Sequence, residues 1–219
     1  MDIVMSSKPA SGHAPVLQVR GLHFGFAGQH LFTDWEADFP AGLSLVAGGD
    51  GAGKTSLLRL LAGDCAPQAG RMILLGVDAT VQGNDYRAQV FWRDPRAPWP
   101  EDLTPQAWVD DVAARYARWS DEDWRSHVAG FSLAQHLHKP VYQLSSGSQR
   151  KLLLAAALAS GAALTLLDEP VAALDKASIT YLLQALEREA RTLRLPQRAV
   201  IVAHYDELGG LPWRHKIQL

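Results

Sequence analysis

The chain has 219 residues, and 21 Lys and Arg against 23 Asp and Glu give it a formal net charge of −2. This balance excludes the strongly basic surface that is typical of nucleic-acid binding, so no nucleic-acid partner is expected. The single cysteine, Cys65, excludes an internal disulfide and suits a reducing compartment.

Residues 1–14 lack the long apolar core of a secretory signal and are predicted to form a flexible tail before a domain over 15–219. The longest uncharged run, Leu152 to Leu167, is shorter than the roughly 20 residues of a membrane-spanning helix. Ser160 and Gly161 interrupt this run, which therefore predicts a buried helix, a turn and a buried strand. The chain is expected to act at a membrane only through a partner.

Four elements are predicted in the first part of the domain. Val16 to Phe26 alternates apolar and polar residues and predicts a strand of an antiparallel layer, followed by a second strand over Trp35 to Phe39. Leu43 to Ala47 predicts a buried strand, and Thr55 to Ala62 predicts a helix that ends at Gly63.

The segment between that buried strand and that helix has the P-loop pattern Gly48-x-x-x-x-Gly53-Lys54-Thr55. Glycines let backbone N–H groups approach an anion, and the helix start adds unpaired N–H groups and a positive dipole end. Lys54 would contact the β- and γ-phosphates, and Thr55 would offer its hydroxyl to Mg²⁺. A chance glycine-rich turn is the alternative, which the flanking strand and helix disfavour. The predicted nucleotide contacts are Gly48, Gly49, Asp50, Gly51, Ala52, Gly53, Lys54, Thr55 and Ser56.

The middle of the chain changes character. Short strands are predicted over Gly70 to Gly76 and over Gln89 to Trp92, followed by a proline-rich connection. Thr104 is a predicted N-cap, with a proline after it and a helix to about Trp119. The region over about residues 94–158 is therefore predicted to be a helical subdomain inserted in the core.

The run from Ser120 to Asp123 opens a further predicted helix, because acidic residues suit a helix start. The tryptophans of this region are interpreted as packing residues without a chemical role.

Ser145, Ser146, Gly147 and Ser148 stand just before an apolar helical stretch. Small residues at a helix start create an anion site from backbone N–H groups. An ordinary N-cap fits the serine hydroxyls equally well. The position of this segment ahead of Asp168 favours the anion site.

Leu164 to Leu167 predicts a buried strand that ends on Asp168 and Glu169. A carboxylate at this place lies at the carboxyl edge of the sheet, where nucleotides bind. Asp168 would hold Mg²⁺ through water, and Glu169 would orient or deprotonate an attacking water. A strand that merely meets a polar turn is the alternative, which the upstream P-loop disfavours.

The last elements are an amphipathic helix over Ile179 to Leu193, ended by Pro196, and strands over Ala199 to Ala203 and His215 to Leu219. Strands that alternate with helices predict a parallel sheet with right-handed crossovers. His204 ends the first of these strands and would contact the γ-phosphate, although a lone histidine is more often structural. The eight histidines show no zinc-site spacing.

In this order the motifs resemble the ATP-binding cassette of ABC transporters, over nearly the whole chain after Val16. The resemblance implies a Walker B motif in LTLLDE with Glu169 as catalytic base, a D-loop over Ala172 to Asp175, and a switch histidine at His204. It also implies that Phe26 stacks on adenine, with Phe24 as the weaker candidate. The implied fold is an α/β P-loop core with an antiparallel β layer and an inserted helical subdomain.

Two motifs depart from the family pattern. The signature is usually LSGGQ and reads LSSGS here, with Ser146 and Ser148 as the changes. After the predicted strand over Gln89 to Trp92 the family usually carries a glutamine. Either Arg93 or Asp94 substitutes for it, or this coupling element is altered.

The resemblance implies an ATPase that uses ATP and Mg²⁺ and powers a separate membrane permease from the cytoplasmic face. Two cassettes, alike or different, would sandwich ATP between the P-loop of one and the signature of the other. The layout and the run LDEPVAALDK resemble the haem-exporter ATPases of cytochrome c maturation. The alternatives are a soluble ABC-type ATPase and a nucleotide-binding regulator that is not coupled to transport.

Overall fold

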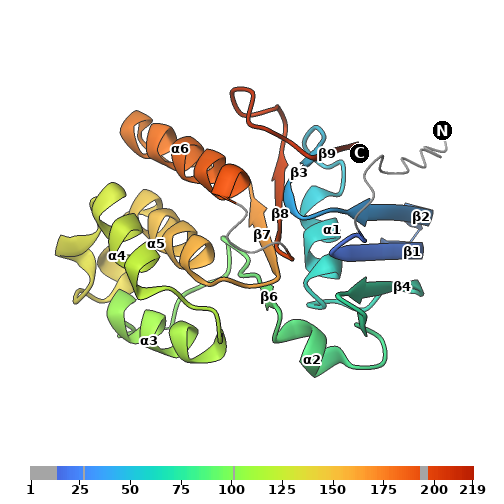
Figure 1. Cartoon of the computed structure of the whole chain (residues 1–219), viewed down its shortest axis with the longest axis horizontal. Coiled ribbons are helices and arrows are strands. Elements are labelled where there is room, and N and C mark those ends of the chain that lie inside the picture. The colour runs from blue at the N-terminus through green and yellow to red at the C-terminus, as the bar shows by residue number, and fades with distance from the viewer. Residues whose placement is uncertain (1–13, 27, 101, 193–196) are drawn as a thin grey trace.

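The computed structural model describes residues 14–26, 28–100, 102–192 and 197–219 (Figure 1). Two sheets form the frame of the molecule, and helices lie between them and along the outer side of one sheet. The predicted tail, apart from Ala14, and the predicted helix end at Leu193 and Pro196 lie outside the described residues.

An antiparallel sheet has the strand order β2-β1-β4-β5. Its strands are β1 (Leu17–Phe26), β2 (Gln29–Phe39), β4 (Ala69–Leu74) and β5 (Val77–Asp78). The predicted first strand is confirmed. The second begins at Gln29 instead of Trp35, because pairing with β1 holds a polar segment extended that shows no alternation of its own.

A parallel sheet has the strand order β6-β7-β8-β3-β9. Its strands are β3 (Gly42–Ala47), β6 (Val90–Phe91), β7 (Leu164–Asp168), β8 (Ala199–His204) and β9 (His215–Gln218). Successive side chains of a strand point to opposite faces, so Val200 and Val202 join one core while Ile201 and Ala203 join the other. The predicted α/β fold with one parallel sheet and one antiparallel layer is confirmed.

Helix α1 (Lys54–Leu61) lies between the two sheets (Figure 1) and buries Leu57, Leu58, Leu60 and Leu61 completely. The other helices are α2 (Gly83–Arg87), α3 (Pro105–Arg115), α4 (Asp121–Gly130), α5 (Ser146–Ala159) and α6 (Lys176–Thr192), with short 3₁₀ turns at Ala134–His136 and Val141–Gln143. Helices α3 to α6 share a core with the far face of the parallel sheet. The boundaries of the helical subdomain stay a prediction.

Two of the predicted helix starts are confirmed by their caps. The Thr104 hydroxyl accepts a hydrogen bond from the Ala107 N–H at 3.2 Å, and the Ser120 hydroxyl accepts one from the Asp123 N–H at 3.1 Å. Helix α3 ends before the predicted Trp119 because Tyr116 turns extended, and its hydroxyl donates to the Val90 carbonyl at 2.9 Å.

Helix α6 begins at Lys176, ahead of the predicted Ile179. The cause is a cap that the apolar pattern does not reveal: the Asp175 carboxylate accepts a hydrogen bond from the Ser178 N–H at 2.9 Å. Within the described ranges, none of the helices combines the length and the apolar character that a membrane crossing requires.

Candidate active site

An open pocket of about 320 Å³ lies where β3 and β7 end and α1 begins. Most of the predicted nucleotide-binding and catalytic residues line it, namely Phe26, Gly49, Asp50, Gly51, Ala52, Gly53, Lys54, Thr55, Ser56, Asp168 and Glu169. Arg96, which the motifs do not point to, lines it as well. The pocket thus gathers residues from four separate parts of the chain.

The P-loop leaves the start of α1 open. Gly51 and Gly53 have φ angles of +77° and +97°, which only glycine adopts at low cost. Gly53 is the N-cap of α1, and no side chain caps the helix. A Cβ atom on Gly49 would meet no other atom within 4 Å. The unpaired N–H groups at the start of α1 therefore face open space, which suits the binding of a phosphate.

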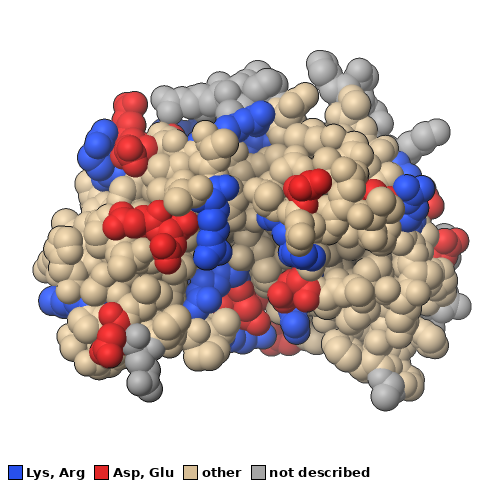
Figure 2. Space-filling model, turned by 90° about the horizontal axis from the view of Figure 1, so that it is seen from below, with Lys and Arg blue, Asp and Glu red and all other residues tan. Residues whose placement is uncertain are grey.

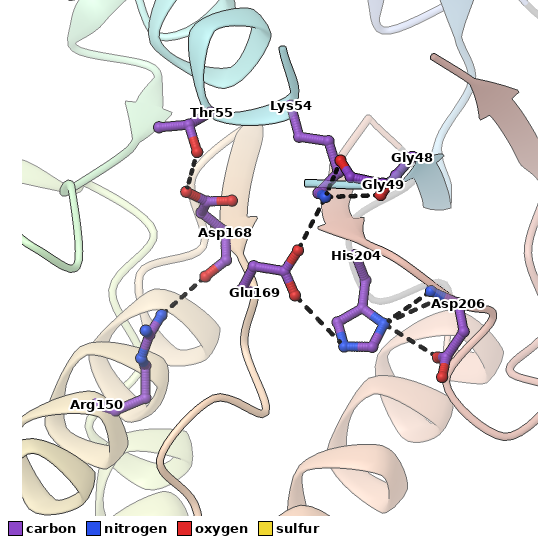
Figure 3. Close-up of polar contacts among 9 residues, drawn as sticks. All are labelled: Gly48, Gly49, Lys54, Thr55, Arg150, Asp168, Glu169, His204 and Asp206. Atoms are coloured by element: carbon purple, nitrogen blue, oxygen red, sulfur yellow. Dashed lines mark hydrogen bonds and ion pairs between the residues drawn. The ribbon is translucent and has the colours of Figure 1, made fainter. Parts of the chain in front are cut away.

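Lys54 is buried, yet its ammonium group reaches the mouth of the loop (Figure 3). Its Nζ donates to the carbonyls of Gly48 at 2.7 Å and Gly49 at 3.1 Å, and lies 3.1 Å from Glu169 Oε1. The Gly48 N–H donates in turn to the His204 carbonyl at 3.3 Å, which ties the loop to β8. The Lys54 ammonium group therefore lies between the loop and the Glu169 carboxylate.

Asp168 ends β7 and is almost fully buried. Its Oδ2 accepts a hydrogen bond from the Thr55 hydroxyl at 2.7 Å, and its carbonyl accepts one from Arg150 Nη1 at 2.8 Å. Burial raises the pKa of the Asp168 carboxyl. Its Oδ1 is buried, with no hydrogen-bond partner among the described residues.

Oxygen atoms of Asp168 and Thr55 thus lie side by side, which is the donor chemistry that Mg²⁺ prefers. No cluster of three or more His, Cys, Asp and Glu within the described part of the chain could hold a metal ion. Magnesium in nucleotide sites is held largely by phosphates and waters, so one carboxylate and one hydroxyl are a sufficient protein contribution.

Glu169 follows in the left-handed region, with φ +43°. For a residue other than glycine this costs on the order of 1–3 kcal/mol and persists only where the surroundings hold it. The Glu169 N–H donates to the Ala203 carbonyl at 2.9 Å, which fixes the turn. The turn aims the carboxylate at the pocket, toward Lys54 and toward His204 Nε2 at 3.5 Å (Figure 3).

His204 is 1% exposed at the end of β8. Two groups of Asp206 contact Nδ1 of the His204 ring: the backbone N–H of Asp206 lies at 3.1 Å and its Oδ1 at 3.0 Å. These contacts orient the ring so that Nε2 faces Glu169. Asp206 was not singled out in the sequence, where its only signal is a polar turn directly after His204.

The signature residues do not reach this pocket. Ser145 is the N-cap of α5, and its hydroxyl accepts a hydrogen bond from the Ser148 N–H at 3.1 Å. Ser145 and Ser146 are exposed, and Ser146 lines a second hollow together with Ala173 of the D-loop. Within one chain this segment is therefore a capped helix start, and its contact with nucleotide stays a prediction. The Asp175 carboxylate of the D-loop pairs with Lys151 at 2.6 Å.

Neither of the predicted substitutes for the family glutamine lines the nucleotide pocket. Arg93 lies 3.9 Å over the Trp99 ring, and its Nη2 donates to the carbonyls of Ala97 at 3.2 Å and Pro98 at 3.0 Å. Asp94 Oδ1 accepts a hydrogen bond from the Arg96 N–H at 2.8 Å. The loop thus turns Arg93 away and carries Arg96 into the pocket.

Phe26 is 60% exposed at the rim of the pocket, where it contacts Phe24 edge to face at 5.3 Å. It is not a core residue. An exposed ring beside the P-loop fits a platform for a base, and the stacking itself stays a prediction.

The family model for ABC transporters matches residues 38–172. The chain belongs to the ABC transporter family. Its relatives include the cytochrome c biogenesis ATP-binding export protein CcmA of Alkalilimnicola ehrlichii, which is 35% identical over 204 residues, 91% of this chain and 85% of that protein. The taurine import ATP-binding protein TauB of Pseudomonas entomophila is 36% identical over 161 residues, 71% of this chain and 61% of that protein.

Solved structures of the same family share the fold. A structure of an ATP-binding subunit of an ABC transporter superposes with a TM-score of 0.76 at 20% identity, over 87% of this chain and 79% of that one. A dimeric, post-hydrolysis state of the cassette MJ0796 bound to ADP and Pi gives 0.68 at 17% identity, over 87% and 88%. The chain is thus an ABC ATPase that serves as the ATP-binding subunit of a transporter with a separate permease. The resemblance to the cytochrome c maturation ATPases is confirmed as well.

Proposed function

We propose that this chain binds ATP with Mg²⁺ in the P-loop pocket and hydrolyses it when a second cassette closes over the nucleotide. The observation that carries the proposal is the convergence of Lys54, Asp168 and Glu169 on one pocket from a strand end and a helix start. His204, at the end of a second strand, lies behind Glu169, with Nε2 3.5 Å from its carboxylate. Such a cluster of charged groups beside an uncapped helix start suits phosphoryl transfer.

The chain's own groups supply most of the chemistry. Glu169 would accept a proton from water as the water oxygen attacks the γ-phosphorus in line with the leaving ADP oxygen. Lys54 and the N–H groups of the P-loop would stabilise the charge that gathers on the phosphate oxygens. His204, held by Asp206, would keep the Glu169 carboxylate in place and contact the γ-phosphate. Thr55 and Asp168 would hold Mg²⁺, which neutralises phosphate charge when it is bound.

The proposal extends to the partners and the location of the chain. Because Ser145 and Ser146 are exposed and lie outside the pocket of their own chain, a second cassette is proposed to bring its signature to this P-loop. The permease would be a separate membrane chain, with this subunit on its cytoplasmic face. One relative is named for export and another for import, so neither direction nor cargo is part of the proposal.

Phosphate release by Glu169→Gln tests the proposal. The amide keeps the shape of the side chain and removes its basicity, so steady-state release should fall roughly 10²- to 10⁴-fold. ATP affinity should survive, because the P-loop is unchanged. Glu122→Gln, on the exposed first turn of α4, is the matched control and should hydrolyse like the wild type. Normal hydrolysis by Glu169→Gln would remove this residue from its role, and a wild type that binds ATP without releasing phosphate would favour the regulator.

A further inference from the structure

Among the described residues that line the pocket, Arg96 is the one charged residue that neither the motifs nor the family pattern accounts for. It lies on the loop after β6 and lines the pocket together with Lys54, Thr55, Asp168 and Glu169. In this region the family usually carries a neutral glutamine, whereas here a guanidinium enters. The pocket therefore carries one more positive charge than the family pattern implies, near the residues predicted to contact the terminal phosphate.

The loop is built to deliver this side chain. The Asp94 carboxylate accepts the Arg96 N–H at 2.8 Å, and its carbonyl accepts the Ala97 N–H at 3.0 Å, which closes a tight turn. Arg93 braces the same turn from outside, through the carbonyls of Ala97 and Pro98 and through its contact with the Trp99 ring. Asp94 and Arg93 are thus both engaged in holding the turn.

The Arg96 guanidinium itself is free to take a ligand. Its side chain is exposed, and none of the described residues accepts a hydrogen bond from it or pairs with it. The same charge acts on the neighbouring Asp168, where it opposes the effect of burial and lowers the pKa of the carboxyl. Arginine presents five donors in a planar fork that matches phosphate oxygens.

We propose that Arg96 binds the terminal phosphate of a nucleoside triphosphate and so makes the site prefer ATP over ADP. The proposal rests on the proposed function of the pocket. Lys54 is buried against the P-loop on one side of the phosphate position, and Arg96 enters from the loop after β6. A nucleoside diphosphate lacks the group that Arg96 would hold, so its affinity should not depend on this residue.

Equilibrium binding of ATP and of ADP, each with Mg²⁺, tests the proposal in a Glu169→Gln background that prevents turnover. Arg96→Gln should weaken ATP about 5- to 20-fold, the size of one exposed charge-assisted contact, and change ADP less than about twofold. Arg96→Lys, which keeps the charge, should recover part of the loss. Arg125→Gln, an exposed residue of α4, makes the same charge change away from the pocket and should change neither affinity.

Equal losses for ATP and ADP, or equal losses in Arg96→Gln and Arg125→Gln, would overturn the proposal, since both would show a general charge effect. An unchanged ATP affinity in a folded Arg96→Gln protein would overturn it too. Failure of the proposed function looks different, because the Glu169→Gln protein with Arg96 intact would then bind neither nucleotide.

Discussion

The two helices α1 and α5 both begin after a run of small residues, but their starts differ. At α1 the N-cap is Gly53 in the left-handed conformation, and no side chain takes the first N–H groups. At α5 the N-cap is Ser145, whose hydroxyl already accepts the Ser148 N–H. The first N–H groups are therefore open at the start of α1, whereas at the start of α5 a side chain of the same chain already takes one of them.

The glycines at the two starts also serve different ends. A Cβ atom on Gly49 would stand in open space, whereas one on Gly147 would lie 2.5 Å from the Ala173 carbonyl. The first glycine keeps room for a ligand, and the second allows α5 to pack against the D-loop. One chain thus carries an open helix start beside the pocket and a closely packed helix start outside it.

The described residues form no large patch of a single charge on the face drawn in Figure 2. Lys and Arg side chains lie beside Asp and Glu side chains along the middle of this face, in agreement with the net charge of −2.

Lys54→Ala should give the largest effect on nucleotide affinity and tests the open helix start of α1. The substitution removes a fixed cation worth about 3 kcal/mol to a phosphate, so ATP affinity should fall roughly 100-fold. Binding and thermal unfolding are measured together, and the melting curve should show a folded protein. An affinity equal to that of the wild type would show that the open helix start does not bind phosphate.

The second prediction concerns a buried contact between helices α4 and α6. His127 of α4 is buried, and its Nδ1 lies 3.0 Å from the Tyr181 hydroxyl of α6. Burial lowers the pKa of His127 from 6.5 to about 4 in the folded protein. Between these values the unfolded chain binds a proton that the folded chain excludes, so stability should fall by about 3 kcal/mol as the pH drops from 6.5 to 4.

Urea unfolding gives the free energy of unfolding of the wild type and of His127→Phe at pH 7 and at pH 4. The contribution of His127 is the loss of stability between the two pH values in the wild type minus the loss in the variant. The carboxyl groups are the same in both proteins, so their contribution to the pH dependence cancels in this difference. The variant should lose less stability on acidification than the wild type. An identical loss of stability in both proteins would show that His127 is not buried in its neutral form between α4 and α6.

Gly147→Ala against Gly49→Ala compares the two glycines directly. The methyl group on Gly147 must displace the Ala173 carbonyl, which should cost roughly 1–3 kcal/mol of stability. Gly49→Ala should unfold like the wild type, because its methyl group meets no atom. Equal melting temperatures for both variants would contradict the tight contact between α5 and the D-loop.

Much of this molecule could be predicted from local patterns. Alternation predicted β1, buried apolar runs predicted β3 and β7, and β-branched residues predicted β8. The hydroxyl cap at Thr104 predicted the start of α3, and the acidic run that follows Ser120 predicted the start of α4. Each of these signals acts within a few residues, so a single sequence contains it in full.

Features that depend on another strand or on the exact conformation of a turn were missed. The first half of β2 shows no alternation and is a strand only because β1 pairs with it. Arg96 reaches the pocket because Asp94 and Arg93 shape the loop, and Asp206 orients His204 from a polar turn that resembles many others. The contact that decides β2 is made with another strand, whereas the contacts of Asp94 and Asp206 span two residues each and depend on a turn conformation that the sequence pattern does not reveal.

The central claim is that the open helix start of one chain and the capped helix start of another enclose one ATP. The most direct test is the molecular mass of Glu169→Gln in solution, measured by sedimentation with ATP–Mg²⁺ and with ADP–Mg²⁺. The account predicts a shift from monomer to dimer with ATP and no shift with ADP, and a weaker shift when Gly147→Ala is added. A protein that binds ATP tightly and stays monomeric at high concentration would contradict closure of two identical chains.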